Sequence, residues 1–450
     1  MKHKLSLTTL LLVTALVTVK TNLFGQTTRQ LTIKEAIDLS IKNSKQLKNS
    51  DAKIEEATAA LKEAVQNKLP TVGVSGSYLR LNNPHVDLKV KTSNTGGNGG
   101  GATQSTAKPS SALYGLANVS LPIYAGLRLK YGIESSKYLA EAAHLDADND
   151  REAVILNTIE AYENLYKSKA AADLVRDNLE SNRQRVKDFS NLEKNGLLAR
   201  NDLLKAELQE SNTELSLLDA ENNWKLANVN MNLMLGLPDN TVLSANENDL
   251  QPASVQLKGI EDYIQLGLQN RKDVTALSFR KKAASTGVKA AKGEMYPSVA
   301  LTGGYVAANI PNILTITNAV NIGVGVKYNL NLGKNNSQVE QARAREKQVE
   351  ANQEMLANDI QLEINQAYQN YLLGRKKIEV YEKAVAQSEE NYRIVKNKFD
   401  NSLATTTDLL EADVAQLQAR LNMAFSKADA SVAYNKLLQT AGLLDNLQTK

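Results

Sequence analysis

The residue types that most often carry out chemistry are scarce in this chain. It contains no cysteine and three histidines. The lack of cysteine excludes disulfides, thiolate metal ligands, a cysteine nucleophile and a lipid-modified cysteine. His3 lies at the very start, and His85 and His144 are far apart in the sequence. We therefore expect no histidine metal site, no histidine-based catalytic triad, no cofactor and no enzymatic activity.

One apparent nucleotide-binding motif is excluded by its spacing. Residues 332–337 read LGKNNS and contain a Gly-Lys pair. A phosphate loop needs a second glycine five residues earlier and a serine or threonine directly after the lysine, and both are missing. The segment is expected to be a strand-to-helix turn, with Gly126 at the equivalent place in the first half of the chain.

The first residues have the features of a secretory signal peptide. Lys2 and Lys4 precede an apolar run that ends at Val19, and the small Gly25 offers a cleavage point. We expect residues 1–25 to be removed during export; the alternative is an uncleaved anchor. Without the three lysines of this segment, 50 of the 53 basic residues remain against 49 acidic ones. Because no basic excess or stripe is visible, a nucleic-acid partner is not expected.

The chain is an internal duplication. Residues 31–78 align without a gap on residues 258–305, with 12 identities in 48 positions. Further along, the offset falls from 227 to 206, because residues 81–112 are replaced by the shorter 308–318. Self-similarity of this kind indicates a repeated structural unit. We therefore predict a first repeat at 26–237 and a second at 238–450. The most informative identities pair Asn43 with Asn270, Pro70 with Pro297, Tyr162 with Tyr368, Asp202 with Asp408, and Gly236 with Gly442.

Each repeat contains two segments that alternate like membrane strands. They lie at about 71–80 and 113–123, and at about 298–307 and 319–331. Such alternation over about ten residues indicates a transmembrane β-barrel strand with an apolar face toward lipid and a polar face toward a wet lumen. The alternative is a strand of a soluble sandwich. In the fourth segment the apolar set is Val320, Ile322, Val324, Val326, Tyr328 and Leu330, and the intervening set is Asn321, Gly323, Gly325, Lys327 and Asn329.

Two further features concern the connections between these segments. The glycine-, serine- and threonine-rich stretch at 92–110 cannot bury a core, so it is expected to be a mobile surface loop. After the signal peptide no stretch approaches 18 apolar residues, so no transmembrane helix is predicted.

The remaining segments predict long helices with a narrow apolar stripe. Between Lys334 and Phe399 the apolar or small residues recur at a spacing close to 3.5, which indicates a coiled-coil seam. Such a helix reaches roughly 100 Å at 1.5 Å per residue. The stripe consists of Val339, Ala342, Val349, Leu356, Ile360, Ile364, Ala367, Tyr371, Ile378, Tyr381, Val385, Tyr392, Val395 and Phe399. The stripe of the partner helix consists of Leu410, Val414, Leu417, Leu421, Phe425, Ala428 and Val432.

Two short turns join these helices into hairpins, at KNGLLARNDLL (194–204) and DNSLATTTDLL (400–410). Gly196 is a good helix terminator, and Asn201 or Asp202 and Thr407 or Asp408 suit the start of the next helix. Apolar residues at an exposed tip are unusual unless a partner docks there. The alternative is that each leucine folds back and closes the seam of its own hairpin. The candidate docking residues are Leu197 and Leu198 in the first turn and Leu403 and Ala404 in the second.

The chain resembles the TolC family of outer-membrane efflux proteins over nearly all of its length after the signal peptide. The resemblance rests on five segments in duplicated order. The resemblance implies a homotrimer with a shared 12-stranded membrane β-barrel, four strands per chain, and an α-helical barrel of long coiled-coil helices in the periplasm. The carriers are LTIKEAIDLSIKNSKQL (31–47), LPTVGVSGSY (69–78), LPIYAGLRLKYGI (121–133), and the two tip segments with their repeated DLL-x-A run at 202–206 and 408–412.

The resemblance also implies partners and site residues. In the family, a glycine-leucine pair at the helical tips contacts a periplasmic adaptor, which couples the channel to an inner-membrane pump. Gly196 and Leu197 match this pair, whereas Ser402 replaces the glycine before Leu403. Some members narrow the tube with an acidic ring near the tip. Glu389 and Glu390 are candidates for it; alternatively they are solvated glutamates on a helix face.

These observations predict an outer-membrane channel subunit of a tripartite efflux or type I secretion system in a Gram-negative bacterium. The chain would contact outer-membrane lipid and act as a passive exit duct. The competing hypothesis is a secreted coiled-coil structural or adhesive protein. That hypothesis accounts for the heptads, but not for the four alternating strands or the joint duplication of helix and strand.

Overall fold

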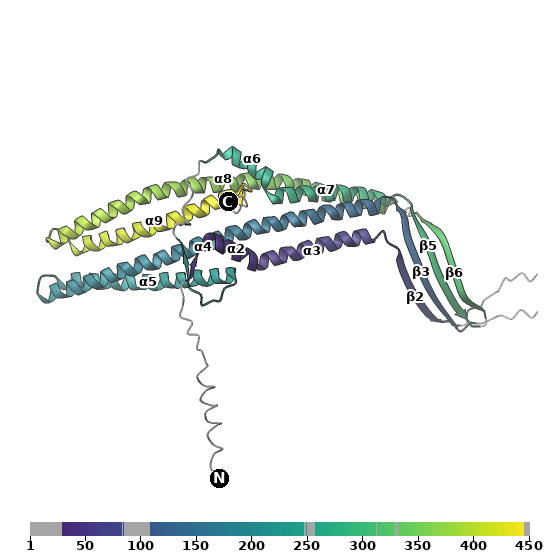
Figure 1. Cartoon of the computed structure of the whole chain (residues 1–450), viewed down its shortest axis with the longest axis horizontal. Coiled ribbons are helices and arrows are strands. Elements are labelled where there is room, and N and C mark those ends of the chain that lie inside the picture. Colours follow the sequence, from purple (N-terminus) through teal and green to yellow (C-terminus); the bar gives the residue numbers. More distant parts are fainter. Residues whose placement is uncertain are drawn as a thin grey trace, which may run out of the picture. The chain divides into compact units, whose positions relative to one another are not determined.

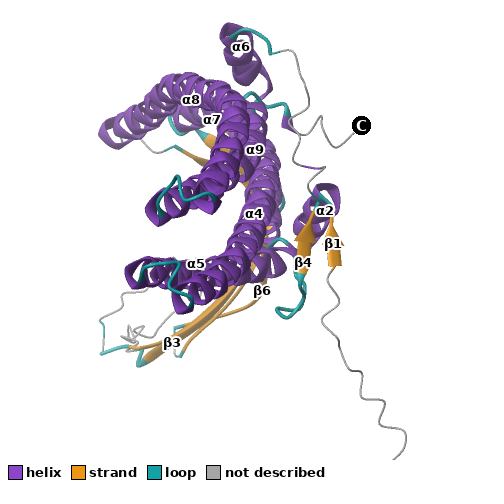
Figure 2. Cartoon of the chain, turned by 90° about the vertical axis from the view of Figure 1, so that its left-hand side faces the viewer, coloured by secondary structure: helices purple, strands orange, loops and turns teal. Residues whose placement is uncertain are grey.

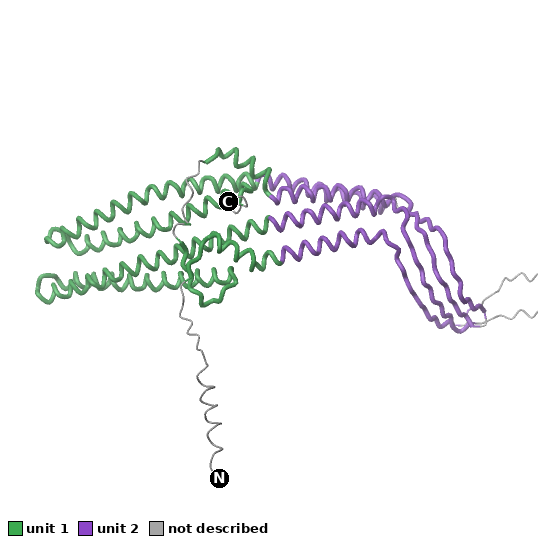
Figure 3. Tube along the Cα trace, viewed as in Figure 1, with its two compact units in different colours: residues 1–48, 149–271, 359–450 green, residues 49–148, 272–358 purple. Residues whose placement is uncertain are grey.

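The computed structural model describes residues 29–82, 84, 109–246, 249, 257–311, 313–328 and 332–444 (Figure 1). The predicted signal peptide at 1–25 and all but two residues of the loop predicted at 92–110 lie outside the described residues. Contacts divide the chain into two units. Unit 1 comprises residues 1–48, 149–271 and 359–450, and unit 2 comprises residues 49–148 and 272–358 (Figure 3). Each unit takes segments from both sequence repeats.

The order of elements is the same in the two halves of the chain. The first half contains β1 (Arg29–Leu31), α2 (Ile33–Asn43), α3 (Lys45–Gln66), β2 (Thr71–Arg80), β3 (Ser111–Ala125), α4 (Arg128–Lys194) and α5 (Arg200–Leu235). The second contains β4 (Leu243–Ala245), α6 (Ile260–Asn270), α7 (Lys272–Gly293), β5 (Ser298–Ile310), β6 (Leu314–Lys327), α8 (Leu332–Asp400) and α9 (Thr406–Thr440). Among the described residues, no helix combines the length and apolar composition needed to cross a membrane.

Most predicted strand positions are close to the observed ones, but the fourth is shifted. The strand expected at about 319–331 runs from Leu314 to Lys327, and residues 329–331 lie outside the described residues. The shift arises because β5 and β6 form a tight hairpin, in which Leu314 already pairs with Ile310. Residues 308–318, which replace residues 81–112 of the first repeat, therefore belong mostly to the two strands. An irregularity in the register between Val306 and Ala308 lies opposite the left-handed Asn318.

Unit 2 contains a four-stranded antiparallel sheet with the order β2-β3-β5-β6. Directly paired residues lie on the same face of a sheet, so the register defines its two faces. Val74 pairs with Ala117, Leu121 with Leu301, and Leu301 in turn with Val324. One face therefore continues across all four strands as a mainly apolar surface. It comprises Val72, Val74, Tyr78, Leu113, Val119, Leu121, Val299, Leu301, Tyr305, Val320, Ile322, Val324 and Val326.

The opposite face of the sheet is small and mainly polar near β6. Gly325 pairs with Ala300, and Gly323 pairs with Thr302. The apolar face is nevertheless exposed in the single chain, and Val324 retains 65% of its accessible surface. A large exposed apolar surface of this kind marks a site that meets a membrane or a partner.

A close approach of two glycines shapes the turn from β3 into α4 in unit 2. Gly126 and Leu127 both adopt left-handed backbone conformations, with φ of 60° and 64°. A Cβ added to Gly126 would lie 2.1 Å from the carbonyl oxygen of Gly293, at the end of α7. Only glycine is tolerated at such a contact, which confirms the strand-to-helix turn expected at Gly126. The same expectation for residues 332–337 was wrong, because these residues already belong to α8.

Unit 1 contains the tip-side parts of two helical hairpins, α4/α5 and α8/α9. Figure 2 views them from their tips. All the predicted stripe residues of α8, from Val339 to Phe399, are buried or half-buried, so the predicted seam is confirmed. Six of the seven stripe residues predicted for α9 are likewise buried or half-buried. Ala428 is buried, but Val414 is exposed, because α9 turns Leu409, Ala412 and Asp413 inward instead.

The repeated asparagines and glycines meet one another in space within unit 1. Gly236 follows α5 with φ of 68°, and a Cβ there would lie 3.0 Å from the Asn43 side chain at the end of α2. The Asn43 amide also donates to the carbonyl of Leu235 at 2.7 Å. The second copy repeats the close approach, since a Cβ on Gly442 would lie 3.0 Å from Asn270. These identities therefore encode the joint between a short helix and the end of a long one.

A buried tyrosine anchors the connecting segments of unit 1. Tyr162 on α4 is fully buried, and its hydroxyl donates to the carbonyl of Leu31 at 2.8 Å. The same hydroxyl accepts from the amide of Asn246 at 2.8 Å, after β4. Burial raises the Tyr162 pKa above its ordinary value. This node fixes the parallel pair of β1 and β4 on the hairpin, beside a core of Leu165, Met231, Leu235 and Leu243.

Candidate docking site at the hairpin tips

The first tip is a helix-terminating turn centred on Gly196. The amide of Leu197 donates to the carbonyl of Leu192 at 2.8 Å, and the amide of Gly196 donates to that of Glu193 at 2.9 Å. This pair of bonds defines a Schellman motif, which requires a left-handed residue after the helix. Gly196 supplies it with φ of 72°. The predicted role of Gly196 as a terminator is confirmed.

The second tip has the same geometry without a glycine. The amide of Leu403 donates to the backbone carbonyl of Lys398 at 2.7 Å, and the amide of Ser402 donates to the backbone carbonyl of Phe399 at 2.9 Å. Ser402 is held at φ of 63°. A side chain in this region is strained, since a left-handed conformation costs a non-glycine residue roughly 1 kcal/mol. The backbone therefore places Leu197 and Leu403 at equivalent positions despite the different residue before them.

The first turns of the helices that leave the tips contain the residues expected there, Asn201 and Asp202 in α5 and Thr407 and Asp408 in α9. Ala199 precedes α5 and provides no side-chain cap. Thr405 caps α9, since its hydroxyl accepts from the amide of Asp408 at 3.1 Å while the Asp408 carboxylate accepts from the amide of Thr405 at 2.8 Å. The carboxylate of Asp408 accepts hydrogen bonds from the amide and the hydroxyl of Thr405, and these two bonds lower its pKa. Asp202 and Asp408 lie in the first turns, where a negative charge is favourable.

The four apolar candidate docking residues differ in their environment. Leu197 and Leu403 project into solvent, with 74% and 75% of their surfaces exposed, so neither folds back onto its own hairpin. Leu198 is half-buried and packs inward, and Ala404, at the equivalent position, is also half-buried. Each tip thus offers one exposed leucine and anchors the next residue below it.

An apolar cluster supports the tips from beneath. Phe189, Leu203, Ala206 and Leu409 are buried together, and the rings of Phe189 and Phe399 stack 5.3 Å apart. The repeated DLL-x-A run explains the symmetry, because its first leucine and its alanine point inward in both copies. The second leucine of the first copy, Leu204, remains exposed.

A polar contact also joins the two hairpins at this level. The Lys205 ammonium group lies 3.3 Å from Asp202 on its own helix and 3.2 Å from the Thr407 hydroxyl on α9. Beside it lies a groove of about 610 Å³ between α5 and α9, whose lining includes Leu208, Leu410 and Val414. The two tips therefore belong to one packed end of unit 1.

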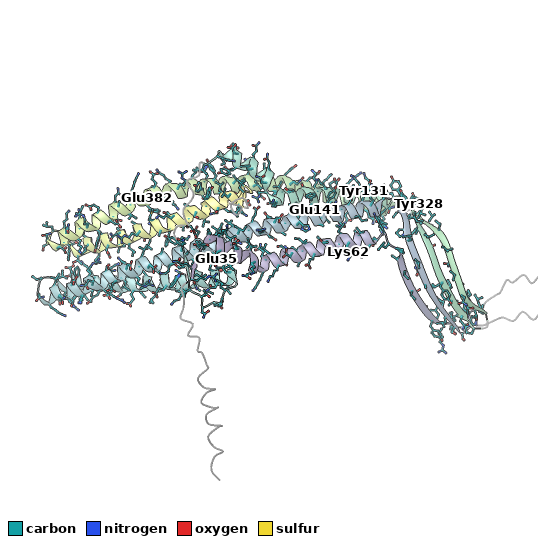
Figure 4. The ribbon with its side chains drawn as sticks, viewed as in Figure 1. Glu35, Lys62, Tyr131, Glu141, Tyr328 and Glu382 are labelled. Carbon is teal, nitrogen blue, oxygen red and sulfur yellow. The ribbon has the colours of Figure 1, made fainter. Side chains whose placement is uncertain are left out.

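The two candidate gate residues each have an arginine partner. Glu389 lies 2.7 Å from Arg420 across the α8/α9 hairpin. Glu390 lies 2.6 Å from Arg393 on its own helix, and this hydrogen bond lowers the Glu390 pKa. Charged side chains project from the same helix around them, as Figure 4 shows for Glu382. The acidic ring stays a prediction. Within one chain, the negative charges of Glu389 and Glu390 are balanced by their two arginine partners.

The sequence did not single out two buried polar sites between the hairpins. One is Glu163, whose burial is complete. The other is an ion pair of Arg185 with Asp413, both nearly buried, at 3.1 Å. A visible signal for the second was Asn182, a polar residue at a seam position between the buried Leu179 and Phe189. Among the described residues, no group of three or more acidic or histidine side chains is placed to hold a metal ion.

The amphipathic sheet, the coiled-coil hairpins and the exposed apolar tips define a class of protein that enters a membrane with strands and extends long helices from it. The chain belongs to the outer membrane efflux protein family, whose model matches residues 36–237 and 263–443. It is therefore an outer-membrane efflux protein. No curated protein sequence matches it.

Solved structures share this fold at low sequence identity. The outer membrane protein VceC from Vibrio cholerae is 19% identical, with a TM-score of 0.73 over 91% of this chain and 96% of VceC. The Campylobacter jejuni CmeC outer membrane channel is 18% identical, with a TM-score of 0.73 over 92% and 86%. The open state of the Neisseria gonorrhoeae MtrE outer membrane channel is 15% identical, with a TM-score of 0.70 over 92% and 89%.

Proposed function

We propose that three copies of this chain form one channel, in which each contributes four strands to a shared 12-stranded barrel and two hairpins to a helical barrel. The support is the sheet itself. Among the described residues, its outer strands, β2 and β6, each pair on one side only. Unpaired backbone groups are not tolerated in lipid, so both edges need a neighbouring copy. The continuous apolar face then meets lipid, and the polar face meets the lumen.

The channel serves as the passive exit duct of a tripartite efflux or type I secretion system. Its helical tips dock to a periplasmic adaptor, which links it to an inner-membrane pump. The observation that carries this proposal is the matched exposure of Leu197 and Leu403 at two turns of the same geometry. Gly196 and Ser402 set the backbone of each tip, and Leu198 and Ala404 support it. The adaptor and pump, rather than this chain, select the cargo.

The docking proposal is tested by placing charges at the tips. Burying a leucine is worth roughly 1.5–3 kcal/mol, and three copies present each tip three times. The double change Leu197→Asp with Leu403→Asp should leave the trimer assembled and abolish adaptor capture and export. The measurements are trimer abundance in outer membranes, adaptor recovery after crosslinking, and export.

Matched controls separate docking from folding. Leu215→Asp and Leu218→Asp change exposed leucines on the shaft of α5, away from the tips, and should leave adaptor recovery higher than the tip variant does. Normal adaptor recovery and export by the tip variant would refute the docking role. Loss of its trimer would instead show that the two leucines stabilise the hairpins.

A further inference from the structure

Six polar side chains form a buried cluster between the two hairpins of unit 1, called here the Arg185–Asp413 cluster. The first hairpin contributes four of them and the second contributes two. Arg185 and Asp413 retain 8% and 4% of their side-chain surfaces. The members are Asn178, Asn182 and Arg185 on α4, Thr213 on α5, Tyr392 on α8, and Asp413 on α9.

The two charges in this cluster are fully engaged. The Arg185 guanidinium reaches both Asp413 oxygens, at 3.1 and 3.2 Å, and so makes a two-pronged contact. It also donates to Asn182 at 2.7 Å and to the Tyr392 hydroxyl at 3.2 Å. The Asn178 amide donates to Asp413 at 3.1 Å. The hydrogen bonds to Asp413 and its charge outweigh burial and keep the Arg185 pKa raised.

The cluster occupies seam positions that an apolar residue would fill equally well. On α4, the buried Val175, Leu179 and Phe189 continue the seam on either side of Asn182. Asn182 in turn donates to Thr213 on α5 at 3.0 Å. Replacing a buried ion pair by packed apolar residues is often neutral or stabilising, so stability alone does not account for the cluster. A polar residue at a seam position instead specifies pairing and register.

The duplication makes such specification necessary. The two hairpins have similar apolar seams, so a hairpin has alternatives: a like hairpin of another copy, or its proper partner one turn out of register. The cluster is not repeated in the second copy. At the offset of 206, the positions of Asn178, Asn182, Arg185 and Thr213 hold Ala384, Ser388, Asn391 and Ala419, and those of Tyr392 and Asp413 hold Val186 and Glu207.

Wrong pairings therefore leave a buried charge without its partner. If two second hairpins paired, Asp413 would face an asparagine at the position of Arg185. A slip by one helical turn would move Asp413 about 5.4 Å along the seam, beyond the reach of the guanidinium. An apolar seam alone would tolerate either change, because leucines and alanines repeat along it.

We propose that the Arg185–Asp413 cluster is a pairing latch, which joins the first hairpin to the second hairpin of the same chain and fixes their register. Where the proposed function holds, the latch also sets Leu197 and Leu403 at one level for the adaptor. The latch itself does not depend on docking, so its test uses a readout that needs no adaptor.

The chain has no cysteine, so paired cysteines report the register directly. Lys205→Cys with Thr407→Cys places thiols at two exposed positions whose native side chains touch across the hairpins. Lys205→Cys with Glu411→Cys reports a slip by one turn. With the latch intact, a short thiol-reactive crosslinker should join 205 to 407 within one chain, and the 205–411 product should be minor. Lys205→Cys alone reports pairing of like hairpins, as a crosslinked dimer.

Three variants test the latch on this background. Arg185→Ala should lower the ratio of native to slipped product by about tenfold or more, because it leaves a buried carboxylate unpaired. The apolar double variant Arg185→Met with Asp413→Leu should keep the trimer but lose the same discrimination. Arg183→Ala removes a neighbouring exposed pair with Glu214 and should change nothing.

The outcomes separate the latch from simple stabilisation and from docking. A native crosslinking ratio in the apolar double variant would overturn the proposal, since packing alone would then specify the register. If the Arg185→Ala protein does not assemble, the crosslinking ratio of the double variant Arg185→Met with Asp413→Leu still tests the proposal. A lost ratio with normal adaptor capture would support the latch and overturn only its link to the tips.

Discussion

Glu163 is a buried acid on α4 whose surroundings disfavour its charged form. Among the described residues, neither carboxylate oxygen has a close hydrogen-bond partner. Burial raises the Glu163 pKa to about 8, and the negative charges of Asp429 and Asp249 contribute to this rise. The Ser431 side chain and the positive charge of Lys167 act in the opposite direction. The Lys167 charge is itself engaged by Asp429 at 2.7 Å. The residue at the equivalent position of the second copy is Gln369, which is neutral.

We predict that Glu163→Gln stabilises the protein at alkaline pH. A carboxyl with a pKa near 4.5 when unfolded and about 8 when folded binds its proton more tightly in the folded state. Its contribution is therefore most favourable below pH 4.5, falls as the pH rises to 8, and then stays low. The loss at pH 8 is about 4 kcal/mol. The thermal dissociation temperature of wild type should fall over this window, while that of the variant should change less.

Glu160→Gln, at an exposed position on the same helix, is the control. Parallel pH curves for wild type and Glu163→Gln would contradict the assignment.

The candidate acidic ring gives a second prediction at the scale of single residues. If Glu389 and Glu390 line the lumen, reversing both to lysine should alter single-channel conductance and cation selectivity, while adaptor capture stays normal. The mechanism is electrostatic, since charges at a narrow point change the local concentration of ions. Arg393→Gln should act in the opposite sense, because it releases the Glu390 charge. Unchanged conductance in both variants would show that these glutamates are solvated side chains outside the ion path.

At the scale of elements, β6 shows how the sheet separates lipid from water. Val324 lies on the apolar face, opposite Leu301, and Gly325 lies on the other face, opposite Ala300. We predict that Val324→Lys costs roughly 2–4 kcal/mol at the bilayer midplane and sharply reduces the heat-sensitive trimer in membranes. Gly325→Ser should be nearly neutral, because a Cβ there meets Thr302 at 3.5 Å, an ordinary contact. Equal effects of the two changes on trimer abundance would mean that the two faces are wrongly assigned.

Much of the element order could be predicted because helices and strands differ in their period. The bounds predicted for β2 agree with the observed ones, and the α8 seam is confirmed residue by residue. Local turn chemistry also identified Gly196 and Gly126. The α9 stripe was less accurate, because this helix is packed on more than one side and its apolar residues do not all face the same partner.

The buried polar sites could not be predicted, since they depend on contacts between residues far apart in sequence. Nothing local distinguishes Arg185 from the exposed Arg183, and its partner Asp413 is 228 positions away. Ser402 posed a similar problem. Its left-handed backbone follows from the surrounding turn and not from its own preference. The docking role of the tips remains a prediction, because exposure of Leu197 and Leu403 shows where a partner has access and not which partner binds.

At the scale of the whole molecule, the sheet of one chain is incomplete in two respects. Within the part of the chain that the structure describes, β2 and β6 each leave one row of backbone donors and acceptors without a strand beside it. The same sheet presents an apolar face across all four strands, which water does not favour. A bilayer covers that face but cannot satisfy the edges, and the hydrogen bonds that the edges lack are costly in hydrocarbon. Other copies of the chain satisfy both requirements if β6 of one pairs with β2 of the next.

We therefore predict that the protein isolated from outer membranes is a trimer that survives mild detergent and dissociates to monomers on boiling. Closure requires every edge to be paired, so assembly should be cooperative, and partially closed dimers should not accumulate. The measurement is gel mobility with and without heating, together with the mass of the unheated species by light scattering corrected for detergent. Val324→Lys should reduce the unheated band in membranes, whereas the tip variant Leu197→Asp with Leu403→Asp should leave it intact, because the tips lie outside the sheet. A monomer that is stable and soluble without detergent would contradict the shared barrel, since its apolar face and both edges would then be tolerated in water.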